Sequence, residues 1–303
     1  MTLFLPRLSA LAALVLLAAC GPKPRVEAPP AVTVPGYEAV QDGNYLIPGI
    51  DPMYLREENR RAEVEYTAGD APGTIVVDVY VRQLYLVLEG GRALRYAIAV
   101  GREGTSFRGN GYIGRKAEWP SWTPTANMIR TQPEMYAEFA GGLPGGLENP
   151  LGSRALYLYR GGRDTMFRIH GTVDPASIGR ATSAGCIRLF NQDVMDLYER
   201  VGSGAQVKVR TLEESIAIEG PYMDDAWGRA VPETPENIAR KERELVERAE
   251  IEARQAAEAE ARAEAERIAV ERAAAEAERE RLRQCRRQRI SAEDCPPSVV
   301  VEI

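Results

Sequence analysis

Two short stretches decide how this chain folds and what it can do: Met166-Phe167-Arg168-Ile169-His170 and Ser183-Ala184-Gly185-Cys186-Ile187-Arg188. The first alternates polar and apolar residues, which predicts a strand with Arg168 and His170 on one face and Phe167 and Ile169 on the other. The second is a turn of small residues that leads to a cysteine. Because His170 is the only histidine in 303 residues, it is the histidine available as general base if Cys186 acts as a nucleophile.

A thiol needs a neighbouring base or positive charge to become a thiolate at neutral pH, and a histidine at the end of a strand beside Cys186 supplies both. The alternative is structural. A lone histidine is usually a hydrogen-bonded structural residue, and a lone buried cysteine usually behaves as a small inert hydrophobe. His170 and Cys186 are sixteen positions apart, which leaves both interpretations open, because separation in sequence does not give proximity in space.

Further motifs surround the pair. Together they resemble the signature of the L,D-transpeptidase (YkuD-type) family over about residues 74 to 210. The stretches that carry the resemblance are Ile113-Gly114-Arg115-Lys116, Trp119-Pro120, Trp122, Pro124, Asn149-Pro150-Leu151-Gly152, His170-Gly171-Thr172, Ile178-Gly179-Arg180-Ala181, Ser183 to Leu189, and Asn191.

The resemblance implies a mainly β fold, an L,D-transpeptidase-like β-sandwich with a short packed helix. It implies that Cys186 is the nucleophile, attacking a peptide carbonyl at an L-centre of a peptidoglycan stem peptide. His170 takes the thiol proton and later serves the incoming amine, and the main-chain carbonyl of Gly171 orients the imidazole in place of an aspartate. The N–H groups of Gly185 and Cys186 are the expected oxyanion donors, since glycine lets the main chain approach the developing charge.

Substrate contacts are expected from Arg188, whose planar guanidinium suits a carboxylate, and from Ser183 and Asn191, the latter also expected to cap a helix. Trp119 and Trp122 are expected either to hold substrate or to act as packing anchors. The family commonly has a second histidine where this chain has Ala184, a departure that bears on rate and acceptor preference more than on reaction class. Neither an organic cofactor nor a metal is expected, because one histidine is too few for a zinc site.

The N-terminus predicts export. A short apolar run ends in Leu17-Ala18-Ala19-Cys20, which looks like a bacterial lipoprotein box with residues 1–19 as signal peptide and Cys20 as the lipidated N-terminus. The alternative is an ordinary signal peptide with an incidental cysteine. We therefore expect a periplasmic protein anchored to a membrane through Cys20, the outer membrane being favoured over the inner. With 44 acidic and 38 basic residues, a net charge of −6 argues against a nucleic-acid partner.

Alternating apolar residues predict strands at 75–80, 84–88, 96–100 and 206–210, with a hairpin turn at Gly90-Gly91 and a packed helix from Gln192. The Pro/Gly-rich region 119–152 predicts a long loop, interpreted as a substrate-side cap. The expected organisation is a signal peptide (1–19), a Pro-rich disordered tether (20–50), a helical or linker segment (51–73), the catalytic domain (74–210), a linker (211–234), a long charged helix (235–290) and a tail (291–303).

The long helix is predicted from Ala-Glu-Ala-Arg repeats that follow Thr234, a suitable N-cap, and Pro235 in the first turn. Its apolar residues are mostly alanines, so a solvated spacer is favoured over a partner-binding or oligomerising element. Cys285 and Cys295 lie ten positions apart, and in an oxidising periplasm such a pair can close a disulfide.

The sequence thus predicts an envelope lipoprotein that forms a thioester between Cys186 and a stem tetrapeptide. An amine resolves the thioester, either from a second stem peptide or from a lysine of a wall-attached lipoprotein. Two alternatives remain: an L,D-carboxypeptidase or endopeptidase in which water resolves the thioester, and a non-catalytic tether between membrane and peptidoglycan.

Overall fold

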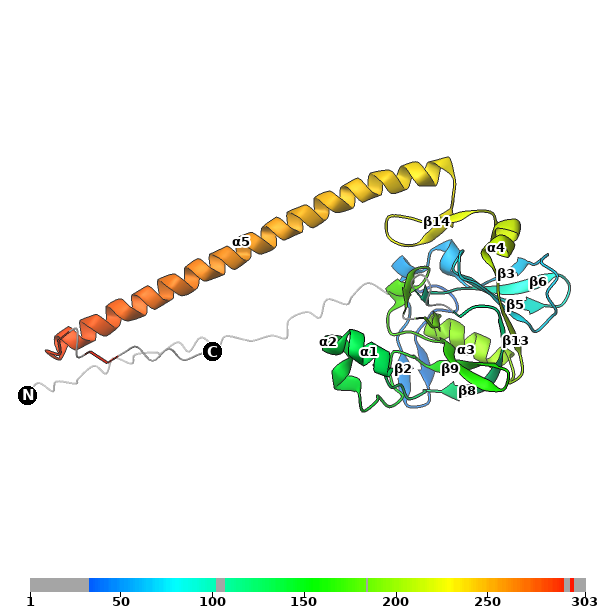
Figure 1. Cartoon of the computed structure of the whole chain (residues 1–303), viewed down its shortest axis with the longest axis horizontal. Coiled ribbons are helices and arrows are strands. Elements are labelled where there is room, and N and C mark those ends of the chain that lie inside the picture. The colour runs from blue at the N-terminus through cyan, green and yellow to red at the C-terminus, as the bar shows by residue number, and fades with distance from the viewer. Residues whose placement is uncertain (1–32, 102–106, 184, 292–294, 297–303) are drawn as a thin grey trace, which may run out of the picture.

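The computed structural model describes residues 33–101, 107–183, 185–291 and 295–296. Among these residues, nine strands form one mixed, mostly antiparallel sheet (Figure 1). In spatial order its strands are β12 (Ile187–Arg188), β10 (Arg163–His170), β9 (Arg154–Arg160), β8 (Asn110–Glu118), β13 (Gln206–Val209), β4 (Ile75–Asp78), β5 (Gln83–Leu88), β6 (Arg92–Ala97) and β3 (Ala62–Glu65). The parallel neighbours are β10 with β12 and β4 with β13.

The sheet curls around the main apolar cluster of the described residues. Ile75, Tyr96, Ile169 and Ile187 come from strands far apart in the sheet order, yet they belong to the same buried cluster. Ala99, just after β6, exchanges two main-chain hydrogen bonds with Arg188 of β12, so the two halves of the sheet meet. Helix α3 (Asn191–Arg200) closes the core with Val194 and Leu197. The expected mainly β fold with a packed helix is confirmed.

Local signals account for these strands. Gly90 and Gly91 both have positive φ, 72° and 70°, and they connect β5 to β6 as the sequence predicts. On β10, Ile169 is fully buried in the core and Phe167 packs against it, so the predicted alternation of faces is confirmed. The smaller strands β7 (Val100–Gly101) and β11 (Ala181–Ser183) pair in parallel.

The expected disordered tether is wrong for residues 33–50, which we call the N-terminal arm; residues 20–32 lie outside the described part. The arm contains the hairpin of β1 (Val40–Asp42) and β2 (Tyr45–Ile47). Tyr37 is 3% exposed and Ile47 1% exposed. The Tyr37 hydroxyl donates to Asp193 at the start of α3, and its ring meets Phe190 edge to face. A few well-placed large side chains outweigh the proline-rich composition.

The two expected linkers are also folded. Residues 51–73 contain 3₁₀ turns η1 (Pro52–Tyr54) and η2 (Glu57–Asn59), and then β3, an edge strand of the main sheet. Residues 211–234 contain α4 (Leu212–Glu219), begun by a capping box at Thr211, and a hairpin of β14 (Tyr222–Asp224) and β15 (Ala230–Pro232). The Arg82–Asp224 ion pair and the Arg180–Arg229 bridge attach this hairpin to the domain.

Helix α5 (Pro235–Arg287) projects away from the sheet (Figure 1). Thr234 caps it by accepting from the Asn237 N–H, and its 53 residues correspond to a length of about 80 Å. Arg248 near its base donates to the Ala226 carbonyl and lies over the Trp227 ring. At its far end a disulfide joins Cys285 to Cys295. Among the described residues, no helix is long and apolar enough to cross a membrane.

Candidate active site

β10, which ends at His170, and β12, which begins just after Cys186, lie side by side in parallel. In this register Ile169 faces Ile187 and His170 faces Arg188, so Cys186, just before β12, falls opposite Arg168. The main-chain N–H of Arg168 donates to the Cys186 sulfur. The charges of Arg168 and Arg188 act on both the imidazole and the thiol, so the two groups share the same surroundings. The register thus places the turn that holds Cys186 beside the strand that ends at His170.

The imidazole of His170 is held in one tautomer. Its Nδ1 lies 2.7 Å from the carbonyl oxygen of Gly171, and because a carbonyl only accepts, Nδ1 carries the proton and Nε2 is left with its lone pair. His170 is 4% exposed. Burial lowers the pKa of His170 to about 3, the positive charge of Arg188 adding to the shift. The imidazole is therefore neutral over the physiological range.

Cys186 is partly exposed and carries a thiol. Burial of the sulfur raises the pKa of Cys186, while the Arg168 N–H and the two arginine charges oppose that rise. The resting pair is thus a neutral thiol beside a neutral imidazole. Such a pair transfers its proton when the sulfur attacks, whereas a preformed thiolate and imidazolium would need a lowered thiol pKa.

The turn before Cys186 depends on glycine. Gly185 has a φ of 135°, which glycine adopts without the steric cost of a Cβ. Ser183 pairs through its main chain with Gly101 across β11 and β7, but its side chain lies outside what the structure describes, as does Ala184. The expectations for Ser183 and for the Ala184 departure therefore stay predictions.

Asn191 does not cap the helix as expected: Phe190 is the N-cap of α3, and Asn191 is its first residue. Its side chain instead joins two loops, accepting from the Ser153 N–H at 3.0 Å and donating to the Thr172 carbonyl at 2.9 Å. A Cβ on Gly171 would lie 2.1 Å from the Asn191 Oδ1, so this position has room only for glycine. Asn191 thereby fixes the loop that carries the Gly171 carbonyl.

The region between β8 and β9 is not one irregular loop. It holds α1 (Ala126–Thr131), α2 (Pro133–Tyr136) and η3 (Ala137–Phe139), and it ends against the site, where a Cβ on Gly152 would lie 2.8 Å from the Gly171 main chain. Trp122 exchanges two main-chain hydrogen bonds with Leu143, and its ring lies near those of Tyr136 and Phe139. Trp119 stacks on Tyr45 of the arm at 4.2 Å. Both tryptophans therefore anchor this segment.

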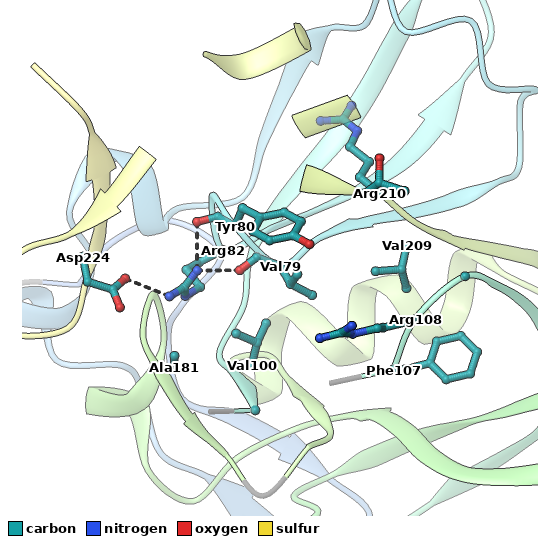
Figure 2. Close-up of a pocket in the computed structure, with 13 residues that line it drawn as sticks. Val79, Tyr80, Arg82, Val100, Phe107, Arg108, Ala181, Val209, Arg210 and Asp224 are labelled. Atoms are coloured by element: carbon teal, nitrogen blue, oxygen red, sulfur yellow. Dashed lines mark hydrogen bonds and ion pairs between the residues drawn. The ribbon is translucent and has the colours of Figure 1, made fainter. Parts of the chain in front are cut away.

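A cavity of about 800 Å³ lies beyond the β7–β11 pair (Figure 2). Its walls include Val100, Ala181, Arg82 and Arg108. His170 and Cys186 do not line it. Arg82 is paired with Asp224 there, and Arg210 with Asp78 and Glu219, so most of the positive charge of this cavity is neutralised.

Comparison with known proteins finds similar sequences over the domain that holds this site. The family model of the YkuD L,D-transpeptidase catalytic domain matches residues 72–209. The chain is 36% identical to a putative L,D-transpeptidase of Fuscovulum blasticum over 138 residues, which are 45% of this chain and 68% of that protein. It is 33% identical to the probable L,D-transpeptidase ErfK/SrfK of Escherichia coli (strain K12), covering 45% and 43% of the two chains.

The chain therefore belongs to the L,D-transpeptidase (YkuD) family, as the sequence motifs predict. The match spans less than half the length of the ErfK/SrfK relative. A solved structure described as a probable carnitine operon oxidoreductase from Brucella melitensis is 49% identical, covering 50% of this chain and 94% of that one, with a TM-score of 0.37.

Proposed function

We propose that this protein is a peptidoglycan L,D-transpeptidase that uses Cys186 as nucleophile and His170 as general base. The observation that carries the proposal is the imidazole whose Nδ1–H is bound by the Gly171 carbonyl, on the strand directly beside the turn that holds Cys186. That arrangement directs the free lone pair of Nε2 towards proton transfer. Family membership supplies the substrate class, the stem peptides of peptidoglycan.

The proposed reaction has two halves. The thiol proton passes to Nε2 of His170 as sulfur attacks the carbonyl at the L-centre, and the resulting imidazolium returns a proton to the departing terminal D-amino acid. This leaves a thioester on Cys186. An acceptor amine then attacks the thioester and His170 takes its proton. Collapse of the tetrahedral intermediate forms the new amide bond and expels the sulfur, which takes the proton back from the imidazolium, so the neutral thiol and imidazole are restored.

Charge stabilisation is assigned to the turn and to Arg188. The N–H groups of Gly185 and Cys186 are the proposed oxyanion donors, at a turn that only glycine allows at position 185. Arg188, directly across from His170, is the proposed partner for a carboxylate of the stem peptide. Its charge also keeps the resting imidazole neutral, so it favours the form of His170 that can accept a proton.

One incubation separates the outcomes. Purified tetrapeptide muropeptide is mixed with the enzyme and the products are resolved by mass spectrometry. A cross-linked dimer supports transpeptidation, a trimmed monomer shows that water resolves the thioester, and unchanged substrate contradicts the proposal. Adding a lysine-containing wall-lipoprotein peptide tests the second acceptor, because attachment to it would add the mass of the acyl peptide.

We also propose that Cys20 carries acyl chains that hold the protein to a membrane in the periplasm, although residues 1–32 lie outside the described structure. Support comes from the Leu17-Ala18-Ala19-Cys20 sequence. The Cys20→Ser variant should move from the membrane fraction to the soluble fraction. If it still sediments with membranes, the lipid anchor is wrong.

A further inference from the structure

The N-terminal arm, which precedes the family match that begins at residue 72, contacts the domain through a buried charge cluster. Asp42 at the end of β1 accepts two hydrogen bonds from the Arg154 guanidinium, at 2.6 and 3.0 Å. The same carboxylate accepts from Trp119 Nε1 at 2.8 Å. Only 6% of the Arg154 side chain and 19% of the Asp42 side chain are exposed, so solvent screens this pair weakly.

Arg154 is connected to the imidazole of His170 through the main chain of Gly171. It begins β9, and its main-chain carbonyl accepts the N–H of Gly171 at 3.1 Å. The carbonyl of Gly171 in turn binds Nδ1 of His170, and Ala155, the next residue of β9, faces His170 across the sheet. Asp42 therefore lies three contacts from the imidazole, through Arg154 and Gly171.

The arm also contacts the segment between β8 and β9 at Trp119 and Gly145. The Tyr45 ring stacks on Trp119, and its hydroxyl donates to the Gly145 carbonyl at 3.0 Å. Gly145 packs so tightly on the Trp119 main chain that a Cβ there would lie 2.0 Å from the Trp119 oxygen. Asp42 therefore contacts Trp119 at the start of this segment and Arg154 just after its end. Tyr45 contacts Trp119 and Gly145.

We propose that Asp42 is a positioning residue for the thiol–imidazole site, acting through Arg154 and Gly171 on His170, so that the N-terminal arm is a working part of the active site. Without the carboxylate, the Arg154 guanidinium would be a buried cation without its bidentate partner, and the strand end that binds Gly171 would shift to solvate it. The inference rests on the proposed function for its kinetic consequence, but its structural consequence is measured on the imidazole itself.

The chain offers a matched control. Asp70, like Asp42, accepts from an aromatic side chain and from a cation: Tyr66 Oη at 2.6 Å and Lys208 Nζ at 3.1 Å. Its side chain is 13% exposed, close to the value for Asp42, and its partners do not contact the His170 loop. Asp70→Ala therefore removes a similar cluster without touching the proposed path.

The test uses the full chain labelled with ¹⁵N-histidine. Because the sequence has one histidine, the two imidazole nitrogen signals need no assignment. We expect wild type and Asp70→Ala to show a neutral Nδ1–H tautomer down to low pH. In Asp42→Ala the tautomers should mix and the imidazole pKa should rise towards its ordinary value of about 6.5. Thioester formation with a carbapenem should slow about tenfold in Asp42→Ala and less than twofold in Asp70→Ala.

A double variant isolates the path. In a His170→Asn background, Asp42→Ala should cause no further loss of rate, since the group that it positions is gone. If Asp42→Ala does not fold, Asp42→Asn replaces it, because an amide keeps an acceptor for Trp119 but loses the ion pair with Arg154.

Imidazole signals and acylation rate that stay at wild-type values in Asp42→Ala or Asp42→Asn would overturn the proposal, and so would equal changes in Asp70→Ala. An imidazole that responds as expected in a protein that forms no thioester would support the positioning role while refuting the proposed function. The two failures are therefore distinguishable.

Discussion

The two flanks of the L,D-transpeptidase domain differ in how they relate to it. The N-terminal arm is short, and it packs two of its large side chains into the domain: Tyr37 and Ile47 are 3% and 1% exposed. Helix α5 is long and regular, and it leaves its large apolar side chains in solvent: Leu245 and Val246 are 46% and 61% exposed. Regular secondary structure and integration into the fold are therefore separate properties.

This contrast follows from how each flank is stabilised. The arm has little main-chain hydrogen bonding of its own beyond a three-residue ladder, so its order depends on burial and on Asp42, Tyr45 and Tyr37 finding partners in the domain. Helix α5 satisfies its main chain internally and carries short-range ion pairs such as Arg248–Glu252, each contributing only about 0.3–0.5 kcal/mol. The arm therefore depends on the domain for its ordered conformation, whereas helix α5 does not.

The largest predicted effect is that of removing the nucleophile, which gives the background rate of the assay. Cys186→Ala should lower thioester formation at least about 10³-fold, because no other group in the site replaces the sulfur. Mass spectrometry after incubation with a carbapenem should show an adduct on wild type and none on the variant. An adduct on another residue would show that the mechanism, and with it the functional meaning of the arm, is wrong.

The second prediction compares the flanks directly. Ile47→Ala should lower the free energy of unfolding by roughly 2–5 kcal/mol, since it removes fully buried methyl groups and leaves a cavity. Leu245→Ala should change it by less than about 0.5 kcal/mol, because the side chain is half exposed and alanine favours the helix. Urea unfolding followed by tryptophan fluorescence measures both. Equal losses for the two variants would contradict the distinction between the flanks.

The third prediction concerns His170, the proposed general base, whose imidazole is buried and which the arm is proposed to position. The folded pKa of His170 is about 3, below the unfolded value of about 6.5, so the unfolded state binds more protons between these values and stability falls as pH falls through this window. Wild type should lose about 2 kcal/mol relative to His170→Asn between pH 8 and pH 5. Denaturation of both proteins at several pH values gives the difference, and a difference that is constant with pH would refute the burial of a neutral imidazole.

The elements that could be predicted from the sequence are those that depend on local interactions, and those that could not depend on contacts between distant residues. The strand ending at His170, the Gly90-Gly91 turn and the helix after Thr234 could be predicted because their signals are local: alternation, glycine at positive φ, and a cap followed by repeats. The register of β10 on β12 could not be predicted, because pairing between segments that are distant in sequence leaves no local pattern. The roles of Asp42 and Arg154 were missed, because one aspartate in a proline-rich segment gives no local sign of a partner 112 positions away. Asn191 was wrongly assigned as a helix cap, because its side chain bonds the main chain of Ser153 and Thr172 instead.

The smallest predicted effect concerns the far flank. A variant that ends at residue 256 keeps Arg248 on Ala226 and Trp227, so its transpeptidation of soluble muropeptides should stay within about twofold of wild type. A variant that ends at residue 235 loses that contact, which in a half-exposed setting is worth at most about 1 kcal/mol, and should remain folded and active. Both are compared with the full chain in the same muropeptide assay and in urea unfolding.

Loss of folding or activity in the shorter variant alone would mean that the base of α5 belongs to the domain, as the arm does. Loss in both would mean that the exposed helix contributes to the site, and the distinction between the two flanks would fail.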